Sequence, residues 1–245
     1  MKVLPAAVSV ALLALSGCGG GGAGGDGQLK VSAAASLKKA LPDYQSSASY
    51  SFAGSDELAA QIRAGARPDL FAAANTKLPE ALFAAGLVER PVVFAGNRLV
   101  LAVPAAASKV RALADLARPG VTIAAGAASV PVGSYTREVL SRLPPAEGKR
   151  ILANIRSNEP DVAGVVGKLT QGGVDAGFVY VTDVKAAGGR LRAIELPASL
   201  QPKVAYAAAV VKGTKHHDAA VKYAAGLVTG DGRAALARAG FDPPP

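Results

Sequence analysis

The sequence contains one cysteine among its 245 residues, Cys18. A single thiol excludes an internal disulfide framework, and it excludes the thiolate-rich sites that hold structural zinc or iron–sulfur clusters. Only two histidines are present, His216 and His217, and they are neighbours. Adjacent imidazoles cannot readily supply both a catalytic base and a metal centre elsewhere, so most hydrolase and metalloenzyme functions are disfavoured.

Aromatic residues are also scarce: they make up 5% of the chain, and tryptophan is absent. A base-stacking platform for nucleic acid therefore has little to be built from. The net charge is +9, which could suit nucleic acid, an anionic membrane surface or an anionic ligand. Because the basic residues are scattered, with no run of five, we interpret most of them as a solvated surface.

The overall amino-acid composition indicates a globular protein. Half of the residues are hydrophobic and 18% are charged, with 28 glycines and 16 prolines. The length suits one large domain or two small ones, with a core of useful size.

The first 27 residues predict an export signal and a tether. Met1 and Lys2 form a positive start, an apolar stretch follows, and small residues precede Cys18. This pattern is typical of a secretory signal peptide and is too short to span a bilayer. The run Leu15-Ser16-Gly17-Cys18 resembles the lipobox of bacterial lipoproteins. The resemblance implies a signal peptide over 1–17, a lipidated Cys18, and a flexible glycine-rich tether to residue 27. We therefore expect an extracytoplasmic protein that meets the membrane only through its lipid anchor.

From Leu29 onward, short apolar runs alternate with segments of helical periodicity. Strands separated by helices predict an α/β fold with mostly parallel sheets covered by helices on both faces. Long strands near Val100 and Val210 stand where a chain would cross between two lobes and return. We expect one lobe over 28–98 plus 208–245 and a second over 99–207. No internal sequence repeat is visible. The predicted strands are 29–34, 50–53, 69–73, 98–103, 121–125, 177–181 and 204–211; the predicted helices are 36–41, 58–66, 77–85, 135–143, 161–170, 217–228 and 233–239.

Four turns share one chemistry, because each joins a strand or loop to a predicted helix start through small residues, Gly or Pro. Helix N-termini offer unpaired N–H groups and partial positive charge, so they form ready anion sites. Each turn alone also has an ordinary structural explanation, as a serine N-cap or a first-turn proline. Spacing does not decide whether the turns converge. They lie at 33–37, 52–58, 130–135 and 159–164.

At these turns the chain resembles the molybdate-binding proteins of ABC transporters. The resemblance rests on Ala33-Ala34-Ala35-Ser36-Leu37, on the segments 53–62, 65–71 and 130–135, on Asp161-Val162, and on the run from Ala176 to Asp183. It implies the two-lobed periplasmic-binding-protein fold (type II), with a tetrahedral oxyanion in the cleft between the lobes.

The resemblance also implies five ligand-binding residues. Hydroxyl and backbone N–H groups of Ser36 and Ser55 would donate from the first lobe. Backbone N–H groups of Val132 and Val162, and the phenol of Tyr180, would donate from the second. Such donors suit molybdate, a fully deprotonated dianion, whereas phosphate near neutral pH carries a proton and needs an acceptor. We interpret Asp56 and Asp161 as structural, because carboxylates stabilise the first turns of helices.

The function that follows is capture of molybdate, and of tungstate, for delivery to an ABC permease. The protein would be a monomer and not an enzyme, without a cofactor, and any metal would be held only through the oxyanion's oxygens. The alternatives are binding of sulfate, thiosulfate or phosphate; a serine hydrolase, disfavoured because no Gly-x-Ser-x-Gly elbow occurs; and a nucleic-acid binder, disfavoured by the export signal.

Only 19 positions separate Ser36 from Ser55, and Pro42 interrupts the short helix predicted there. We expect the packing of the first lobe to depart from its relatives in this segment.

Overall fold

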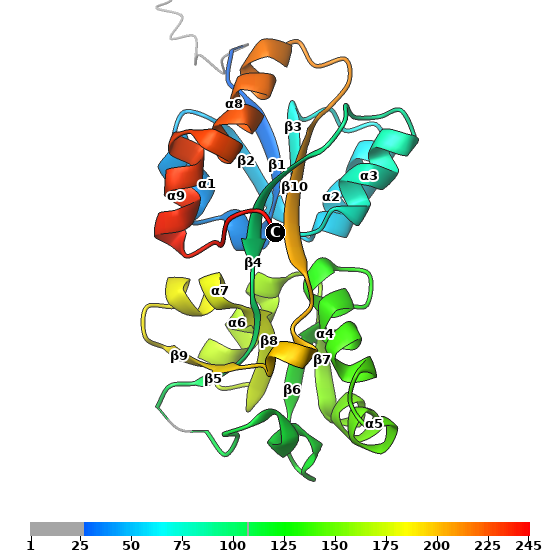
Figure 1. Ribbon diagram of the computed structural model, residues 1–245, viewed down its shortest axis with the longest axis vertical. Helices are drawn as coiled ribbons and strands as arrows, with labels where there is room; N and C mark the ends of the chain where they lie inside the picture. Colours follow the sequence, from blue (N-terminus) through cyan, green and yellow to red (C-terminus); the bar gives the residue numbers. More distant parts are fainter. Residues whose placement is uncertain (1–26, 107) are drawn as a thin grey trace, which may run out of the picture.

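A computed structural model describes residues 27–106 and 108–245. It has two lobes stacked along the long axis, each built around a five-stranded sheet with helices on both faces (Figure 1). The predicted signal peptide and the lipidation site Cys18 lie outside the described residues, as does the tether before Gly27.

The sheet of the first lobe has the strand order β2-β1-β3-β10-β4. Strands β2, β1 and β3 are parallel, whereas β10 runs antiparallel to both β3 and β4. Four of the five strands therefore point the same way, and β10, which enters from the other lobe, opposes them. The strands are β1 (Lys30–Ala34), β2 (Ser49–Ala53), β3 (Leu70–Ala73), β4 (Val92–Asn97) and β10 (Val204–Val210).

Helices cover both faces of this sheet (Figure 1). In α2, Leu58, Ala59 and Ile62 lie on one helical face and pack against Phe71 of β3, because residues three and four apart share a face. Helices α2 (Ser55–Arg63) and α3 (Lys77–Ala84) lie on one side; α1 (Ala40–Tyr44), α8 (His217–Thr229) and α9 (Asp231–Ala239) lie on the other.

The second lobe repeats this topology, with the strand order β7-β6-β8-β5-β9. Here β7, β6 and β8 are parallel, and β5, which enters from the first lobe, opposes its neighbours. The two-lobed α/β prediction is thus confirmed, and a structural repeat exists without a visible sequence repeat. The strands are β5 (Leu99–Pro104), β6 (Ile123–Gly126), β7 (Ile155–Glu159), β8 (Ala176–Tyr180) and β9 (Leu191–Glu195); the helices are α4 (Pro131–Ser141), α5 (Pro145–Asn154), α6 (Val162–Thr170) and α7 (Val181–Ala186), with 3-10 turns η2 (Leu113–Ala117) and η3 (Ala198–Leu200).

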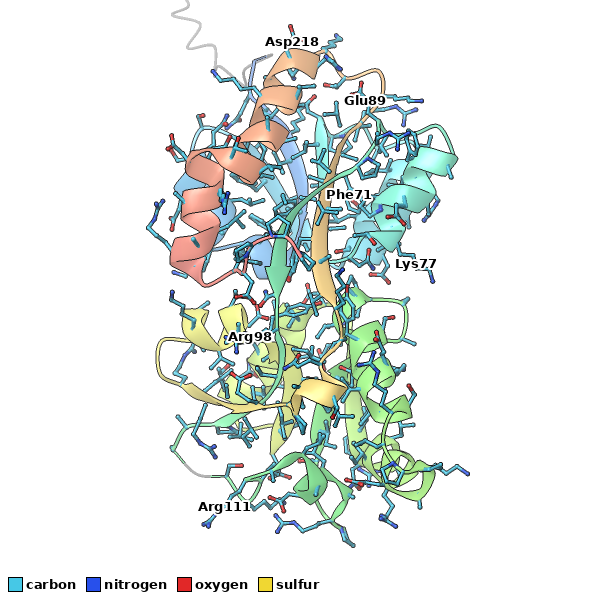
Figure 2. All side chains as sticks on the ribbon, in the orientation of Figure 1. Phe71, Lys77, Glu89, Arg98, Arg111 and Asp218 are labelled. Carbon is cyan, nitrogen blue, oxygen red and sulfur yellow. The ribbon has the colours of Figure 1, made fainter. Side chains whose placement is uncertain are left out.

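The chain crosses between the lobes twice. On the way out, Arg98 alone separates the end of β4 from the start of β5 (Figure 2). On the way back, residues 196–203 include Pro197 and Pro202, which cannot donate to a sheet ladder and so separate β9 from β10. Residues 204–207, which we expected in the second lobe, pair with β4 in the first sheet. The expected boundary at 208 therefore lies four residues too late.

Several predicted elements also differ from the structure. The helix predicted at 36–41 is a 3-10 turn, η1 (Ala35–Leu37), followed by α1. Pro42 does not interrupt α1, because it lies in the first turn, where its missing N–H would have no partner within the helix. Three strands were missed: β4, β7 and β9, all edge strands. The strands β7 and β9 are partly exposed and lack the continuous apolar run that marks a buried strand. Strand β4 does begin with the apolar run 92–95, which the sequence reading did not identify as a strand.

Candidate functional site

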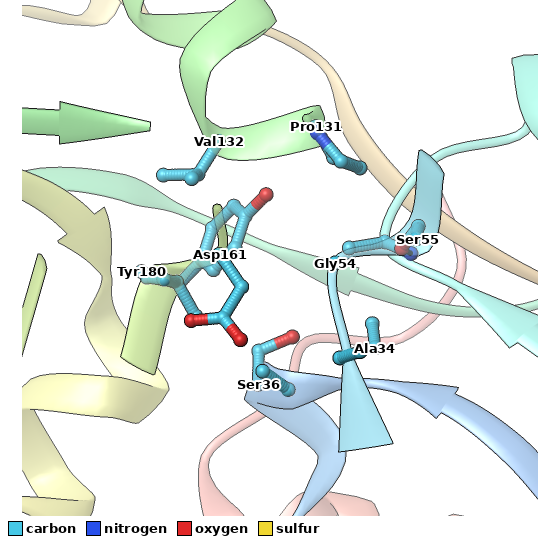
Figure 3. Close-up of a pocket in the computed structure, with 12 residues that line it drawn as sticks. Ala34, Ser36, Gly54, Ser55, Pro131, Val132, Asp161 and Tyr180 are labelled. Carbon is cyan, nitrogen blue, oxygen red and sulfur yellow. Dashed lines mark hydrogen bonds between the residues drawn. The ribbon is translucent and has the colours of Figure 1, made fainter. Parts of the chain in front are cut away.

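A small pocket lies between the two lobes, lined by residues at the carboxyl ends of β1, β2 and β8 and at the starts of α2, α4 and α6 (Figure 3). With the open solvent at its mouth it measures about 230 Å³. All five predicted ligand residues line it. The lining comprises Ala34, Ala35, Ser36, Ala53, Gly54, Ser55, Ala74, Pro131, Val132, Asp161, Val162 and Tyr180.

The pairing of β1 with β2 brings the two serines together. Ala34 at the end of β1 is in register with Ala53 at the end of β2, so the turns that follow both strands lie side by side. Ser36 lies in η1, and Ser55 is the first residue of α2. Their side chains enter the pocket from neighbouring turns of the first lobe (Figure 3).

The Ser55 hydroxyl has its proton available for a ligand. Its Oγ accepts the backbone N–H of Ala74 at 3.1 Å, and the residue is 1% exposed. A hydroxyl carries one proton and two lone pairs, so accepting from Ala74 leaves the proton uncommitted. Its position in the pocket lining makes that proton a donor toward whatever the pocket holds.

Tyr180 presents a second donor, from the second lobe. The side chain is 1% exposed, and its hydroxyl has no hydrogen-bond partner among the described residues. Leaving a buried hydroxyl unpaired costs about 1–3 kcal/mol, which a bound acceptor would recover. Burial raises the pKa of the Tyr180 phenol well above its usual range, so the hydroxyl keeps its proton at neutral pH. The backbone N–H of Tyr180 donates to Asp183 at 2.9 Å, which anchors this strand end.

Two helix N-termini of the second lobe also reach the pocket. In α4 the first residue is Pro131, which has no N–H, so Val132 carries the first free amide of that helix. In α6 the Asp161 carboxylate accepts the N–H of Gly164 at 2.9 Å, as expected of a capping residue. The N–H of Val162, one residue into α6, lies in the first turn and has no intrahelical acceptor.

The pocket lining contains almost no charged side chains. None of the lining residues is Lys, Arg or His, and Asp161 is the only charged one. Burial raises the pKa of the Asp183 carboxyl to about 7, and the charge of Asp161 adds to that rise. Among the described residues no cluster of three or more His, Cys, Asp or Glu is arranged to hold a metal ion. Apart from the Asp161 carboxylate, the pocket therefore offers neutral hydroxyl and amide dipoles as donors.

Comparison with known proteins assigns the family. A family model described as bacterial extracellular solute-binding protein matches residues 29–242. The chain belongs to the bacterial extracellular solute-binding proteins. The molybdate-binding protein ModA of Mycobacterium tuberculosis is 36% identical to it over 197 residues, which is 80% of this chain and 73% of that protein. ModA of Escherichia coli is 30% identical over 213 residues, 80% of this chain and 81% of that protein.

The periplasmic molybdate-binding protein of Azotobacter vinelandii has the same fold as this solute-binding protein. The two structures align with a TM-score of 0.78 over 89% of this chain and 100% of the other, at 23% sequence identity. The family resemblance found in the sequence motifs is thereby confirmed. In the stretches 27–106 and 108–245 of this solute-binding protein, no helix is both long and apolar enough to cross a bilayer.

Three residues behind or beside the pocket of this solute-binding protein, Ala74, Asn97 and Tyr206, were not predicted from the sequence, and Gly54 was predicted only as part of a turn. The backbone N–H of Ala74 donates to the Ser55 hydroxyl, and Gly54 allows a close approach between the lobes. Asn97 and Tyr206 hydrogen bond near Ser36. The available signal was the hydroxyl of Tyr206, the one polar side chain in the otherwise apolar run Val204–Val210.

Proposed function

We propose that this protein captures molybdate outside the cytoplasmic membrane and delivers it to an ABC permease. The observation that carries the proposal is the donor chemistry of the pocket between the lobes. Hydroxyls and helix N-termini line it, and no cationic side chain does. A molybdate dianion has four oxygens and no proton, so it needs donors alone and no buried countercharge. The names of the curated relatives support the same ligand.

The five predicted ligand residues divide between the lobes. Ser36 and Ser55 donate from the first lobe, and Val132, Val162 and Tyr180 donate from the second. A ligand that bonds to both sides holds the lobes together, which is the conformational signal that a permease can recognise. Tungstate, which has nearly the same size and charge, binds the same donors. The protein acts as a carrier and not as an enzyme, and it needs no cofactor.

The place of action follows from the start of the chain. Cys18 is lipidated after removal of residues 1–17, and the glycine-rich tether to residue 27 leaves the lobes free to reach the permease. We expect a monomer, because the ligand site is completed by the two lobes of a single chain.

Thermal unfolding of the purified protein with a panel of oxyanions tests the ligand. Molybdate, tungstate, sulfate, thiosulfate and phosphate are compared at millimolar concentration. A ligand at about a thousand times its dissociation constant stabilises by about 4 kcal/mol, so the midpoint rises by several degrees. We expect large shifts with molybdate and tungstate alone, and their loss in Ser55→Ala. Larger shifts with sulfate, thiosulfate or phosphate would replace molybdate by that anion.

A further inference from the structure

Three buried polar side chains form a hydrogen-bonded chain that ends at the pocket. Asn97 is the last residue of β4, Tyr206 lies in β10, and Ser36 lies in η1. Asn97 Nδ2 lies 3.4 Å from the Tyr206 hydroxyl, which lies 2.9 Å from Ser36 Oγ. Exposure is 6% for Asn97, 0% for Tyr206 and 8% for Ser36, so water has little access to these groups.

The amide of Asn97 has only one sensible orientation. Its Oδ1 accepts the backbone N–H of Arg98 at 2.9 Å, and its Nδ2 donates to Thr182 Oγ1 at 2.9 Å. The flipped amide would place its NH₂ group against the N–H of Arg98, donor against donor. Nδ2 therefore faces Tyr206 as a donor, and the phenolic oxygen of Tyr206 accepts from it.

Because its oxygen accepts from Asn97, the Tyr206 hydroxyl has its proton available for Ser36. The ring is held edge-on by Phe94, Tyr180 and Phe241, with centroids 6.1, 5.9 and 5.2 Å away. A phenolic proton lies near the ring plane, so a fixed ring fixes where the proton points. Burial keeps the pKa of Tyr206 well above its usual range, and the phenol stays protonated.

We propose that Asn97 and Tyr206 orient the Ser36 hydroxyl as a donor to the ligand, and so make the pocket select fully deprotonated oxyanions over protonated ones. The distance between Ser36 Oγ and the Tyr206 oxygen allows either to donate, and the donation from Asn97 to Tyr206 assigns the shared proton to Tyr206, so that Ser36 Oγ uses one lone pair to accept it. Its own proton then points to the pocket that Ser36 lines. Hydrogenphosphate has one unprotonated oxygen fewer than molybdate, so each hydroxyl that is fixed as a donor makes it harder to place its P–OH without facing another donor. The inference rests on the proposed function, because it names what discriminates among tetrahedral anions at that same site.

The same amide joins the two lobes. Thr182, which accepts from Asn97, lies in α7, two residues beyond the proposed ligand residue Tyr180. Asn97 itself directly precedes Arg98, the single residue that carries the chain into the second lobe. The donor orientation of Ser36 is therefore supported by a residue at the crossing point, which contacts both lobes.

Isothermal titration of molybdate and phosphate at pH 8 into Tyr206→Phe tests the proposal. This variant keeps the ring packing and removes the proton that Ser36 accepts. We expect molybdate affinity to fall about tenfold and phosphate affinity to stay or rise, so that the molybdate-to-phosphate preference falls at least tenfold. Tyr223→Phe is the matched control: it removes an equally buried phenol of the first lobe, which bonds Tyr50 at 3.1 Å and lies outside the pocket lining.

A second variant reverses the direction of the hydrogen bonds from Asn97 through Tyr206 to Ser36 and keeps a polar side chain at each position. Asn97→Asp replaces the Nδ2 donor by an acceptor, so the Tyr206 proton turns toward the carboxylate and Ser36 donates to Tyr206. We expect its preference for molybdate to fall further than in Tyr206→Phe. The proposal is overturned if either folded variant keeps the native preference within twofold. A native protein that binds neither anion would instead refute the proposed function, before any variant is compared.

Discussion

At the scale of single residues, whether a hydroxyl in the pocket can donate to a ligand depends on the other hydrogen bonds that it makes. Ser55 accepts from the backbone of Ala74, and the hydroxyl of Tyr180 has no partner among the described residues. Both protons are therefore available for an acceptor inside the pocket. A hydroxyl that already donates to another protein group would present only lone pairs to a dianion. The hydrogen bonds around a serine or tyrosine therefore decide its part in binding as much as the residue type does.

The carboxylate of Asp161 gives a prediction at this scale. Asn caps a helix as well as Asp does, so Asp161→Asn keeps the bond to Gly164 and removes the one negative charge in the pocket lining. We expect molybdate affinity to rise at least about fivefold, since two like unit charges about 4 Å apart in water repel by about 1 kcal/mol and molybdate carries two. Titration calorimetry measures this, with the exposed Asp218→Asn as control. A tenfold loss would identify Asp161 as an acceptor for a protonated ligand.

At the scale of elements, the start of α4 depends on a glycine. A Cβ at Gly133 would lie 1.8 Å from the carbonyl oxygen of Ala127 and 2.4 Å from that of Gly126. Only hydrogen at this position lets the first turn of α4 pack against the end of β6, and so place the N–H of Val132 at the pocket.

We therefore expect Gly133→Ala to lower the free energy of unfolding by about 2 kcal/mol or more, and to weaken molybdate binding as α4 shifts. The matched control is Gly167→Ala in α6, where a Cβ meets nothing within 4 Å. Alanine there should stabilise by about 0.5–1 kcal/mol. Urea unfolding compares the two variants, and equal stabilities would contradict the packing argument.

A second prediction for the elements concerns acid. Asp69, just before β3, is buried: it accepts the backbone N–H of Lys30 at 2.6 Å, bonds the Thr214 hydroxyl, and lies 3.2 Å from Nδ1 of His216. Burial opposes ionisation, but these bonds outweigh it and hold the pKa of Asp69 below its usual range.

Because the folded pKa is depressed, the stabilising contribution of Asp69 is fully present above about pH 4, the usual range of an unfolded Asp. It is lost as the pH falls through the folded pKa. We expect unfolding free energies measured in urea at pH 7, 4 and 3 to fall less steeply in Asp69→Asn than in the native chain. Asp218→Asn, at an exposed site, should follow the native curve. Parallel curves for all three proteins would exclude this role of Asp69.

At the scale of the whole molecule, the two lobes approach closely at Gly54. A Cβ on this residue of the first lobe would lie 2.4 Å from the carbonyl oxygen of Pro160 and 3.4 Å from Val130, both of the second lobe. It would also lie 2.8 Å from Oδ1 of Asp56 in the first lobe, but this side chain can turn away whereas the backbone of Pro160 cannot. The backbone of Gly54, with φ −59° and ψ 135°, is one that any residue adopts. The glycine is therefore required by the contact between the lobes and not by its own conformation.

Gly54→Ala should accordingly hold the lobes apart while leaving each lobe folded. We expect the unfolding free energy without ligand to change by less than about 0.5 kcal/mol, and molybdate affinity to fall at least tenfold. Small-angle scattering should show compaction on adding molybdate to Gly167→Ala and none in Gly54→Ala. Native affinity in Gly54→Ala would show that closure does not depend on this contact.

The sequence by itself determined the alternation of strands and helices, because central strands carry unbroken apolar runs and helices a period of 3.6 residues. It also indicated four helix starts, since small residues and prolines mark them. The resemblance of these turns to molybdate-binding proteins, and not their spacing, pointed to Ser36, Ser55, Val132, Val162 and Tyr180. Edge strands such as β7 escaped detection, because a partly exposed strand has no continuous apolar run.

Only the tertiary structure decided that the four turns converge, because they lie on two sheets whose relative placement is set by long-range packing. It also decided which hydroxyls keep their proton available for a ligand. The bonds between Ser36 and Tyr206, and between Ser55 and Ala74, join residues 170 and 19 positions apart. Local patterns report backbone preference and burial, whereas the direction of a hydrogen bond depends on partners brought together by folding.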